Sequence, residues 1–291
     1  MPMIWLIGNR GMLGTEVEEL LKSRQMDYIA TDREVDITNA DELLKFSADK
    51  SFSWIINCAA YTAVDKAEDD KELAFKLNAT GPLNIAKVAK AKNAKLIHIS
   101  TDYIFDGTKE GDYTEEDIPN PISVYGASKY QGERNIQETI NEYFILRTSW
   151  LYGKSGNNFV NTMLRLFKEK DEICVVSDQW GSPTYAVDLA MMIVEIVNHD
   201  FDQYGIYNFT NEGKTNWYEY ANYIKSLAQS NGMATNHNSI TPVVTEQYPT
   251  KAKRPNNSTL SKKKIITTFG FDIRKWRIAL AGYFLNMTRE F

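Results

Sequence analysis

Cysteine and histidine are scarce in this chain, which has two cysteines and three histidines among 291 residues. Two cysteines cannot form the dense disulfide framework of small secreted domains. Cys58 and Cys174 lie in apolar runs, so we expect buried free thiols and a reducing, cytoplasmic location. The histidines are scattered without the spacing of metal ligands, which argues against metal catalysis.

The chain also lacks a long apolar run and an excess of positive charge. No run reaches the roughly 20 residues that a helix needs to span a bilayer. Residues 1–7 show neither the charged segment nor the cleavage site of a signal peptide. The net charge is -5 and no long basic run occurs, which argues against a nucleic-acid surface. We therefore expect neither a membrane nor a nucleic acid as a partner.

The start of the chain reads strand, glycine-rich turn and helix. The apolar run over residues 3–7 predicts a strand buried on both faces. Gly8, Gly11 and Gly14 follow, and residues 15–23 carry apolar side chains at helical spacing. The glycine spacing differs from G-x-G-x-x-G by one residue inserted between the first two glycines. Because such a turn lets the backbone approach a pyrophosphate at a helix N-terminus, it predicts a dinucleotide site.

The next expected strand, residues 28–31, ends at Asp32, eighteen residues after Gly14. An acid at this place can accept hydrogen bonds from the adenosine ribose, although a turn residue is the alternative. Arg33 beside it can instead meet a 2′-phosphate. Both NADH and NADPH therefore stay open as cofactors.

Further strands are expected over residues 54–58, 96–100 and 144–148, with helical patterns over 67–77, 83–91 and 129–140. Strands that alternate with helices predict an α/β fold, a Rossmann-type doubly wound parallel sheet. Ligands bind beyond the carboxyl ends of the strands in such a sheet. Five candidate residues fall at these ends: Gly8, Asp32, Ala59, Thr101 and Trp150.

Tyr125 and Lys129 are four residues apart, which places them on one face of a helix. A phenol is a poor acid near pH 7 because its reference pKa is about 10, and a neighbouring ammonium eases its proton transfer. Thr101, delivered by another strand, can hydrogen-bond the same reacting oxygen. The three suit carbonyl reduction, in which carbon receives hydride and oxygen a proton. A surface pair is the common alternative for a Tyr/Lys pair, and the glycine turn favours catalysis.

At 291 residues, the chain can form one large domain or two small ones. We expect a Rossmann domain over 1–150, to which segments around 181–210 return, and a smaller substrate-binding lobe over 151–291. This lobe shows helical patterns over 159–168, 187–197 and 217–226, strands over 173–176 and 205–209, and a polar, irregular segment over 231–248. Arg254 precedes Pro255 in a loop and can grip a phosphate, unless it is solvent-exposed. Trp150 can stack on a sugar or pack in the core.

The chain resembles the extended short-chain dehydrogenase/reductases over essentially its whole length, and within them the dTDP-4-dehydrorhamnose reductase family. The resemblance is carried by AAYTAVDKAE at 59–68, STDYIFDG at 100–107, YGASK at 125–129, RTSWLYG at 147–153, GSPT at 181–184 and RPNNS at 254–258. It implies NADPH- or NADH-dependent reduction of the C4 keto group of dTDP-4-dehydro-6-deoxy-L-mannose to dTDP-L-rhamnose. Tyr125 would be the proton donor, Lys129 its partner and a ribose ligand, and Thr101 the third catalytic hydroxyl.

Larger sets of residues follow from the resemblance and the strand ends together. The expected cofactor-binding residues are Gly8, Arg10, Gly11, Met12, Leu13, Asp32, Arg33, Asp36, Ile37, Ala59, Ala60, Tyr61, Thr62, Asn78, Ser100, Tyr125 and Lys129. The expected substrate residues are Thr101, Asp102, Phe105, Tyr125, Trp150 and Arg254.

The resemblance leaves the assembly and two further functions open. Some family members dimerise around magnesium, and Glu16 and Asp188 lie near matching positions, so a monomer and a magnesium-linked homodimer are both alternatives. A nucleotide-sugar epimerase or dehydratase shares the glycine turn and the Tyr/Lys pair. A non-catalytic regulatory subunit would keep the fold, but Thr101, Tyr125 and Lys129 are all present.

Overall fold

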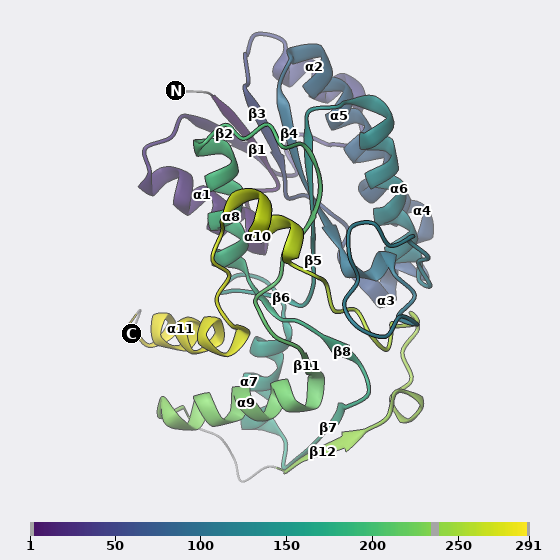
Figure 1. Ribbon diagram of the computed structural model, residues 1–291, viewed down its shortest axis with the longest axis vertical. Helices are drawn as coiled ribbons and strands as arrows, with labels where there is room; N and C mark the ends of the chain where they lie inside the picture. The colour runs from purple at the N-terminus through teal and green to yellow at the C-terminus, as the bar shows by residue number, and fades with distance from the viewer. Residues whose placement is uncertain (1–2, 234–238, 290–291) are drawn as a thin grey trace.

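The computed structural model describes residues 3–233 and 239–289. Its central element is a parallel sheet with the strand order β2-β1-β3-β4-β5-β10 (Figure 1). The strands are Ile4–Ile7 (β1), Tyr28–Thr31 (β2), Trp54–Asn57 (β3), Lys95–Thr101 (β4), Tyr143–Thr148 (β5) and Gly205–Asn208 (β10). The predicted α/β fold with a Rossmann-type parallel sheet is confirmed.

The central strands are continuously apolar because both of their faces are covered. Every residue of β1 and β3 is buried. Ile7 pairs with Thr31 on one side and with Asn57 on the other, so the carboxyl ends of three strands lie level. The strand order changes direction between β1 and β3, and sheets of this kind bind ligands at such a switch point.

A layer of helices packs on each face of the sheet (Figure 1). One layer contains α1 (Met12–Ser23), α8 (Ala186–Asn198) and α10 (Lys263–Phe269), which share a core with the sheet. The other contains α2 (Ala40–Ser47), α5 (Gly81–Lys92) and α6 (Val124–Thr139). Between β3 and α5 lie α3 (Val64–Ala67), α4 (Lys71–Phe75) and the π-helical turn η1 (Lys76–Thr80), and the 3-10 turn η2 (Asp102–Ile104) follows β4.

A second, smaller core lies below the sheet in Figure 1. It is built by α7 (Phe159–Glu169), α9 (Trp217–Ser230) and α11 (Trp276–Arg289). Short strand pairs accompany them: β7 (Glu172–Val176) with β12 (Ser239–Val243), β8 (Trp180–Gly181) with β11 (Thr215–Asn216), and β6 (Leu151–Tyr152) with β9 (Thr184–Tyr185). The 3-10 turn η3 (Thr245–Gln247) follows β12. The division into domains near residue 150 stays a prediction.

The expectation of an irregular segment over 231–248 is wrong for its second half. Residues 239–243 form β12, in which Ile240 lies opposite Ile173 and Thr241 opposite Cys174 of the parallel strand β7. Neither strand has a strong pattern of its own, and the partner of each lies far away in the chain. Residues 234–238 of the segment lie outside the described residues. The helices α2 and α11 were not among the expected elements.

The two cysteines are free, but Cys174 is exposed and the expectation of a buried thiol there is wrong. Side chains of β7 alternate, so that Ile173 and Val175 face the core and Cys174 faces outward. Strand β7 therefore has one covered face, unlike the strands of the central sheet. Cys58, just past the end of β3, is partly exposed.

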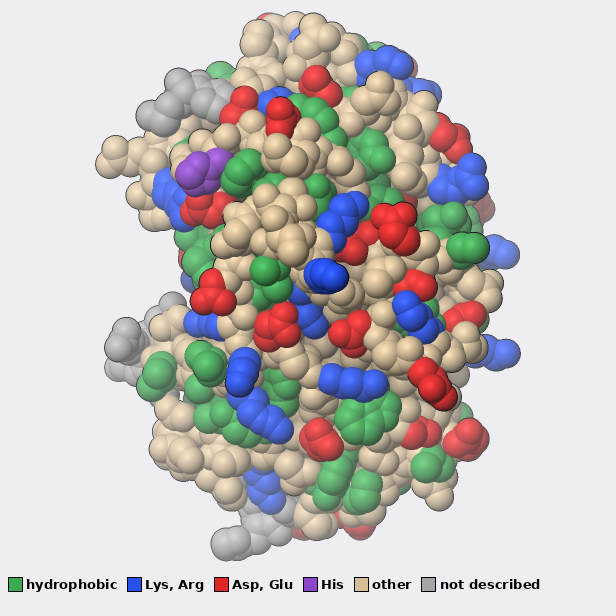
Figure 2. Space-filling view, in the orientation of Figure 1, with side chains coloured by type: hydrophobic (Ala, Val, Ile, Leu, Met, Phe, Trp, Pro, Cys, Tyr) green, Lys and Arg blue, Asp and Glu red, His purple; other side chains and the backbone are tan. Residues whose placement is uncertain are grey.

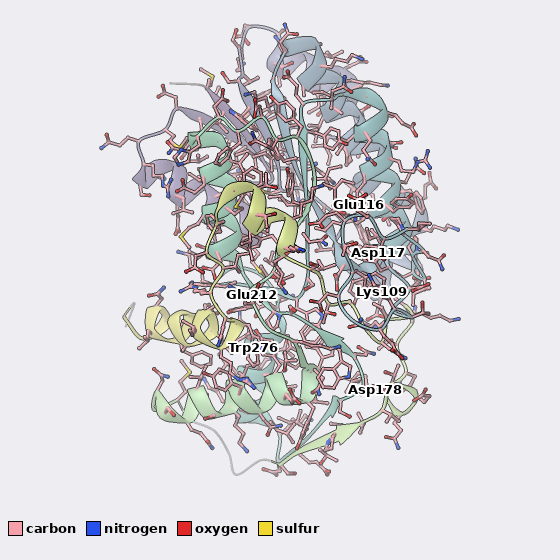
Figure 3. The ribbon with its side chains drawn as sticks, viewed as in Figure 1. Lys109, Glu116, Asp117, Asp178, Glu212 and Trp276 are labelled. Carbon is pink, nitrogen blue, oxygen red and sulfur yellow. The ribbon has the colours of Figure 1, made fainter. Side chains whose placement is uncertain are left out.

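No helix among the described residues is long and apolar enough to cross a membrane. On the face shown in Figure 2, basic and acidic side chains are interspersed rather than gathered by sign. Where the smaller core meets the sheet, Figure 3 labels Glu212 beside Trp276. The Trp276 amide donates to the Glu212 carbonyl at 2.9 Å, which anchors the start of α11 to the segment after β10.

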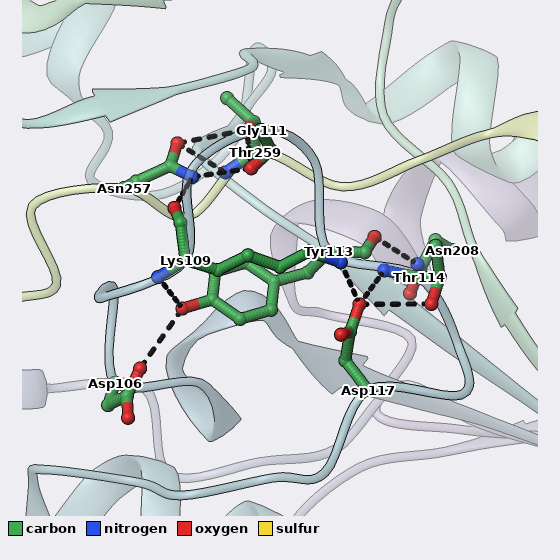
Figure 4. Close-up of polar contacts among 9 residues, drawn as sticks. All are labelled: Asp106, Lys109, Gly111, Tyr113, Thr114, Asp117, Asn208, Asn257 and Thr259. Carbon is green, nitrogen blue, oxygen red and sulfur yellow. Dashed lines mark hydrogen bonds and ion pairs between the residues drawn. The ribbon is translucent and has the colours of Figure 1, made fainter.

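A loop over residues 106–117 ties the C-terminal segment to the sheet (Figure 4). Asn257 donates through Nδ2 to the carbonyls of Lys109 at 2.9 Å and Gly111 at 2.7 Å. Asn208, at the end of β10, donates to the Tyr113 carbonyl at 3.1 Å, and the Tyr113 hydroxyl donates to Asp106 at 3.0 Å. These bonds fix the segment that contains Arg254 near the carboxyl ends of the strands.

Candidate active site

A cavity of about 1040 Å³ opens at the carboxyl ends of β1 to β5. Its size exceeds the usual range of roughly 300–1,000 Å³ for pockets of small ligands. Most of the predicted residues line it: Gly8, Arg10, Gly11, Met12, Leu13, Asp32, Arg33, Asp36, Ile37, Ala59, Ala60, Tyr61, Thr62, Ser100, Thr101, Asp102, Tyr125, Lys129 and Trp150. The sheet thus brings together residues that are more than a hundred positions apart in the chain.

The glycine turn between β1 and α1 leaves room for a phosphate against its backbone. Gly8 has a φ of +81°, which disfavours any side chain. A Cβ at Gly14 would lie 2.0 Å from the Gly8 carbonyl oxygen, so the turn closes tightly on the helix. Gly11 precedes α1 without a side-chain cap, and no acidic residue occupies the first turn. The free amides and the helix dipole therefore fit a pyrophosphate.

Tyr125 lies in the first turn of α6, which begins beside the end of β4. The helix comes close because residue 126 is glycine: a Cβ there would lie 2.1 Å from the Tyr103 carbonyl oxygen. The rings of Tyr103 and Tyr125 meet edge to face, with centroids 5.8 Å apart. Burial raises the pKa of Tyr125 to about 12 and outweighs a hydrogen bond with the Thr101 hydroxyl, which lowers this pKa. Tyr125 is therefore a protonated phenol at neutral pH, in contact with Thr101.

Lys129 lies one turn further along α6 and is almost completely buried, with 2% of its surface exposed. Its Nζ donates to the Ile99 carbonyl at 2.6 Å and lies 3.4 Å from Nε2 of His98. Burial lowers the pKa of Lys129 to about 8, although the negative charge of Glu133 raises it. Lys129 is still mainly an ammonium at pH 7, with a proton that is easily released.

Thr101 and Asp102 end β4 at the floor of the cavity. The Thr101 hydroxyl donates to Oδ1 of Asp102 at 3.0 Å and accepts from the Tyr103 amide at 3.2 Å. Within the described residues, Oδ2 of Asp102 and the hydroxyl of Ser100 have no hydrogen-bond partner. Burial raises the pKa of Asp102 to about 7. Buried polar atoms without partners at a cavity are suited to a polar ligand.

Trp150 lines the cavity and also packs against the smaller core. Its ring stacks on Trp217 of α9 with centroids 3.5 Å apart and an angle of 11° between the planes. Its φ of +47° is unusual for a bulky residue. A Cβ at Gly181 would lie 2.5 Å from the Trp150 ring, so that glycine makes room for it. Trp150 therefore both lines the cavity and packs against the smaller core, so the structure combines the two alternatives for it.

Three predicted residues are not among the described residues that line the cavity. Asn78 binds the Tyr61 backbone through Oδ1 and Nδ2 and donates to the Ser128 hydroxyl at 3.0 Å, so it supports the wall. Phe105 is fully buried and stacks on Tyr113 at 4.2 Å. Arg254 is held by Asp65 of α3, with Nη2 2.7 Å and Nη1 3.0 Å from its oxygens.

The two residues predicted near a magnesium ion, Glu16 and Asp188, are both buried. Both oxygens of Asp188 are engaged by the Arg274 guanidinium, at 2.6 and 2.8 Å, and one also by Asn211 at 2.6 Å. The described residues contain no group of three or more His, Cys, Asp or Glu that could hold a metal ion. In this arrangement Asp188 does not fit a metal site. The magnesium ion stays a prediction.

Sequence reasoning overlooked two groups of residues at the site. Tyr103, Ser149 and Asn157 also line the cavity. Asn57 and His98 are buried behind Lys129. The signal for these last two was a polar residue inside an otherwise apolar strand.

Comparison with known proteins gives a consistent result. The model of the family described as the RmlD substrate binding domain matches residues 2–289. A dTDP-4-dehydrorhamnose reductase of Aggregatibacter actinomycetemcomitans is 42% identical, over 96% of this chain and 97% of that protein. The solved dTDP-4-dehydrorhamnose reductase of Clostridium acetobutylicum is 40% identical with a TM-score of 0.92, covering 99% of each chain.

A second solved structure, dTDP-4-dehydrorhamnose reductase of Bacillus anthracis in complex with NADP, also has 40% identity and a TM-score of 0.92. The match covers 98% of this chain and 99% of that one. Identity at this level over the whole length goes beyond a shared fold. The chain therefore belongs to the dTDP-4-dehydrorhamnose reductase family that the RmlD substrate binding domain describes.

Proposed function

We propose that this protein reduces the C4 keto group of dTDP-4-dehydro-6-deoxy-L-mannose to dTDP-L-rhamnose with NADPH or NADH. The observation that carries the proposal is the meeting of Thr101, Tyr125 and Lys129 in a cavity that also contains the glycine turn. The relatives named above are dTDP-4-dehydrorhamnose reductases. The bound NADP of the Bacillus anthracis structure supports a nicotinamide cofactor.

The chemistry divides between the cofactor and three side chains. The reduced nicotinamide supplies hydride to C4 when it is bound. Tyr125 gives its phenolic proton to the C4 oxygen, for which its raised pKa keeps it protonated. Thr101 would turn its single hydroxyl proton from Oδ1 of Asp102 to the same oxygen when substrate binds. The Lys129 ammonium stabilises the phenolate that forms.

Asp102 and Trp150 are our candidates for holding the sugar. Asp102 and Trp150 both line the cavity, and Oδ2 of Asp102 is a buried polar atom. An acid with a pKa of about 7 can accept from or donate to a sugar hydroxyl near neutral pH. The flat Trp150 ring offers an apolar wall to the other face of the sugar.

The choice of cofactor is decided at the end of β2. Asp32, Arg10 and Arg33 all line the cavity, so a carboxylate and two guanidinium groups are available to a ribose bound there. We expect activity with both cofactors. Asp32→Ala should shift the preference toward NADPH, because it removes repulsion between a carboxylate and the 2′-phosphate. The ratio of kcat/KM for NADPH and NADH measures this, and an unchanged ratio would show that Asp32 does not face the ribose.

The decisive experiment follows absorbance of NADPH and NADH with the dTDP-4-dehydro sugar as substrate. A reductase consumes one reduced cofactor for each sugar. An epimerase or dehydratase, the second candidate function, would convert the nucleotide sugar without net consumption. No turnover in either assay would favour a regulatory subunit. The proposal includes a cytoplasmic location and a monomer or homodimer, which size-exclusion chromatography with and without magnesium separates.

A further inference from the structure

A continuous set of hydrogen bonds runs through the sheet behind the catalytic lysine. At the end of β3 the Ala59 amide donates to Oδ1 of Asn57 at 3.0 Å. Nδ2 of Asn57 lies 3.0 Å from Nδ1 of His98 on β4. Nε2 of His98 lies 3.4 Å from Nζ of Lys129, which donates to the Ile99 carbonyl at 2.6 Å. The set therefore joins the wall of the cavity at Ala59 to Lys129.

The direction of these bonds follows from their first member. A backbone amide can only donate, so the Asn57 atom facing Ala59 must be the oxygen. The amide nitrogen of Asn57 then faces His98 and donates to Nδ1. Because Nδ1 accepts, the proton of the neutral imidazole lies on Nε2 and points toward Lys129.

Burial keeps this histidine neutral. His98 is fully buried and Asn57 is 1% exposed. Burial, together with the charge of Lys129, holds the pKa of His98 well below its usual range. Both side-chain polar atoms of Asn57 are paired, Oδ1 with the Ala59 amide and Nδ2 with Nδ1 of His98, so the orientation of this amide is fixed.

The other ionisable groups around Lys129 come from each neighbouring element. Cys58 follows β3, His98 lies on β4, and Tyr125 and Glu133 lie on α6 itself. The charge of Glu133 is paired with Arg147 of β5 at 2.7 Å. Nε2–H of His98 thus faces the lysine, whose ammonium form has no lone pair to receive it.

We propose that Asn57 and His98 are positioning residues for Lys129. Asn57 fixes His98 as the Nε2–H tautomer, and His98 presents this N–H to Nζ of Lys129 beside Tyr125. The arrangement favours an amine that gives up its proton readily over a permanently charged ammonium. The inference rests on the proposed function, because that function gives Lys129 its role in proton transfer. The tautomer of His98 does not depend on the substrate.

The first test determines the tautomer of His98 in the unaltered protein. Two-bond proton–nitrogen correlation spectra of ¹⁵N-labelled protein distinguish the two tautomers and the imidazolium. With three histidines in the chain, His199→Gln and His237→Gln assign the signals. We expect His98 to carry its proton on Nε2 and not to titrate from pH 5.5 to 8.5. A proton on Nδ1, or a titration within this range, would overturn the proposal.

The second test uses the variant Asn57→Asp to reverse the direction of the hydrogen bond between residue 57 and His98. One oxygen of the new carboxylate still accepts from the Ala59 amide, while the other can only accept from His98 and so draws its proton to Nδ1. Nε2 then offers a lone pair to the Lys129 ammonium. We expect the reversed tautomer, and an alkaline limb of kcat for the reduction that moves up by about one pH unit or more, since a bond to the charged form favours it. An unmoved limb in a folded variant would contradict the proposal.

His199→Gln is the matched control, because His199 lies at the surface beside Glu195 and its side chain is 57% exposed. It should leave the pH profile unchanged. Should Asn57→Asp not fold, the tautomer of the unaltered protein still decides. The two proposals can fail separately. If the protein has no reductase activity, the tautomer of His98 can still be measured, and the expected tautomer would support this inference even though the proposed function had failed.

Discussion

Burial acts in opposite directions on the two ionisable side chains of the Tyr/Lys pair. It raises the pKa of Tyr125 to about 12 and lowers the pKa of Lys129 to about 8. Burial thus moves the two pKa values apart. Near neutral pH, Tyr125 is therefore a protonated acid and Lys129 is a cation. This is the protonation state that a carbonyl reduction requires of its proton donor.

We expect Tyr125→Phe to lower kcat by about 10²- to 10⁴-fold, the usual contribution of positioned acid catalysis. Cofactor affinity should change little, because the phenol oxygen is the only atom removed. Steady-state kinetics and cofactor titration by fluorescence measure the two effects. A variant with near-normal turnover would remove Tyr125 from the mechanism.

Asp102 links chemistry at the site to stability. Its pKa of about 7 in the folded protein lies above the unfolded value of about 3.8. The folded state therefore holds the proton more tightly, and stability present below pH 4 is lost as pH rises through 7, up to roughly 4 kcal/mol. Asp102→Asn cannot ionise, so it should raise Tm at pH 8 and have little effect at pH 4.

Scanning calorimetry of Asp102→Asn at the two pH values tests this, at roughly 2 to 4 °C for each kcal/mol. Activity of the variant should fall, because an amide cannot exchange a proton with the substrate. Equal Tm changes at pH 4 and pH 8 would show that ionisation of Asp102 has no part in the effect.

At the scale of elements, the glycine turn and α1 form the proposed pyrophosphate site by close backbone contact. Gly11 and Gly14 serve different purposes in this contact. A Cβ at Gly14 would lie 2.0 Å from the Gly8 carbonyl oxygen, whereas the nearest atom to a Cβ at Gly11 is 3.4 Å away. We expect the fold to tolerate alanine at position 11 and not at position 14.

We therefore expect Gly14→Ala to lower both stability and cofactor affinity, because backbone must shift. Gly11→Ala should leave Tm within about 2 °C, as surface changes usually do. It should still raise the cofactor Kd, since its methyl group would lie where the pyrophosphate approaches the backbone. Thermal melts and cofactor titrations of both variants test this. Unchanged cofactor binding in Gly11→Ala would place the phosphates elsewhere.

At the scale of the whole molecule, residues 251–254 of the second half are held to helices of the first half. Arg254 pairs with both oxygens of Asp65, and Lys251 pairs with Asp69. The Ala252 amide adds a hydrogen bond to Asp65 at 3.1 Å. Arg254 also interacts with Tyr103, which lines the cavity. We propose that the Arg254 guanidinium exchanges Asp65 for a substrate phosphate.

Arg254→Ala should raise KM for the sugar nucleotide by roughly 10- to 150-fold, the equivalent of a charge-assisted pair of about 1.5–3 kcal/mol. The cofactor Kd should be nearly unchanged, since its pyrophosphate is assigned to the glycine turn. Lys251→Ala is the matched control, because that side chain is 62% exposed and its ion pair contributes little. Equal weakening of sugar and cofactor binding would show that Arg254 is not the phosphate clamp.

Local sequence patterns determined the main strands, the glycine turn and the fold class of this protein. The apolar runs of β1 and β3, the glycine turn and the helical spacing of Tyr125 and Lys129 depend on neighbours in the chain, and the fold class followed from them. The strand ends also indicated Gly8, Asp32, Ala59, Thr101 and Trp150 as residues of the cavity, because parallel strands bring their carboxyl ends to one edge, and the family resemblance supplied most of the others.

Only the tertiary structure decided which distant groups meet. The pairing of β12 with β7, the exposure of Cys174, the bond of Arg254 to Asp65 and the facing of His98 toward Lys129 each join residues far apart in sequence. Periodicity records which face of an element is apolar but not what covers it. Burial, hydrogen-bond direction and pKa depend on that covering partner, and so they could not be predicted from the sequence alone.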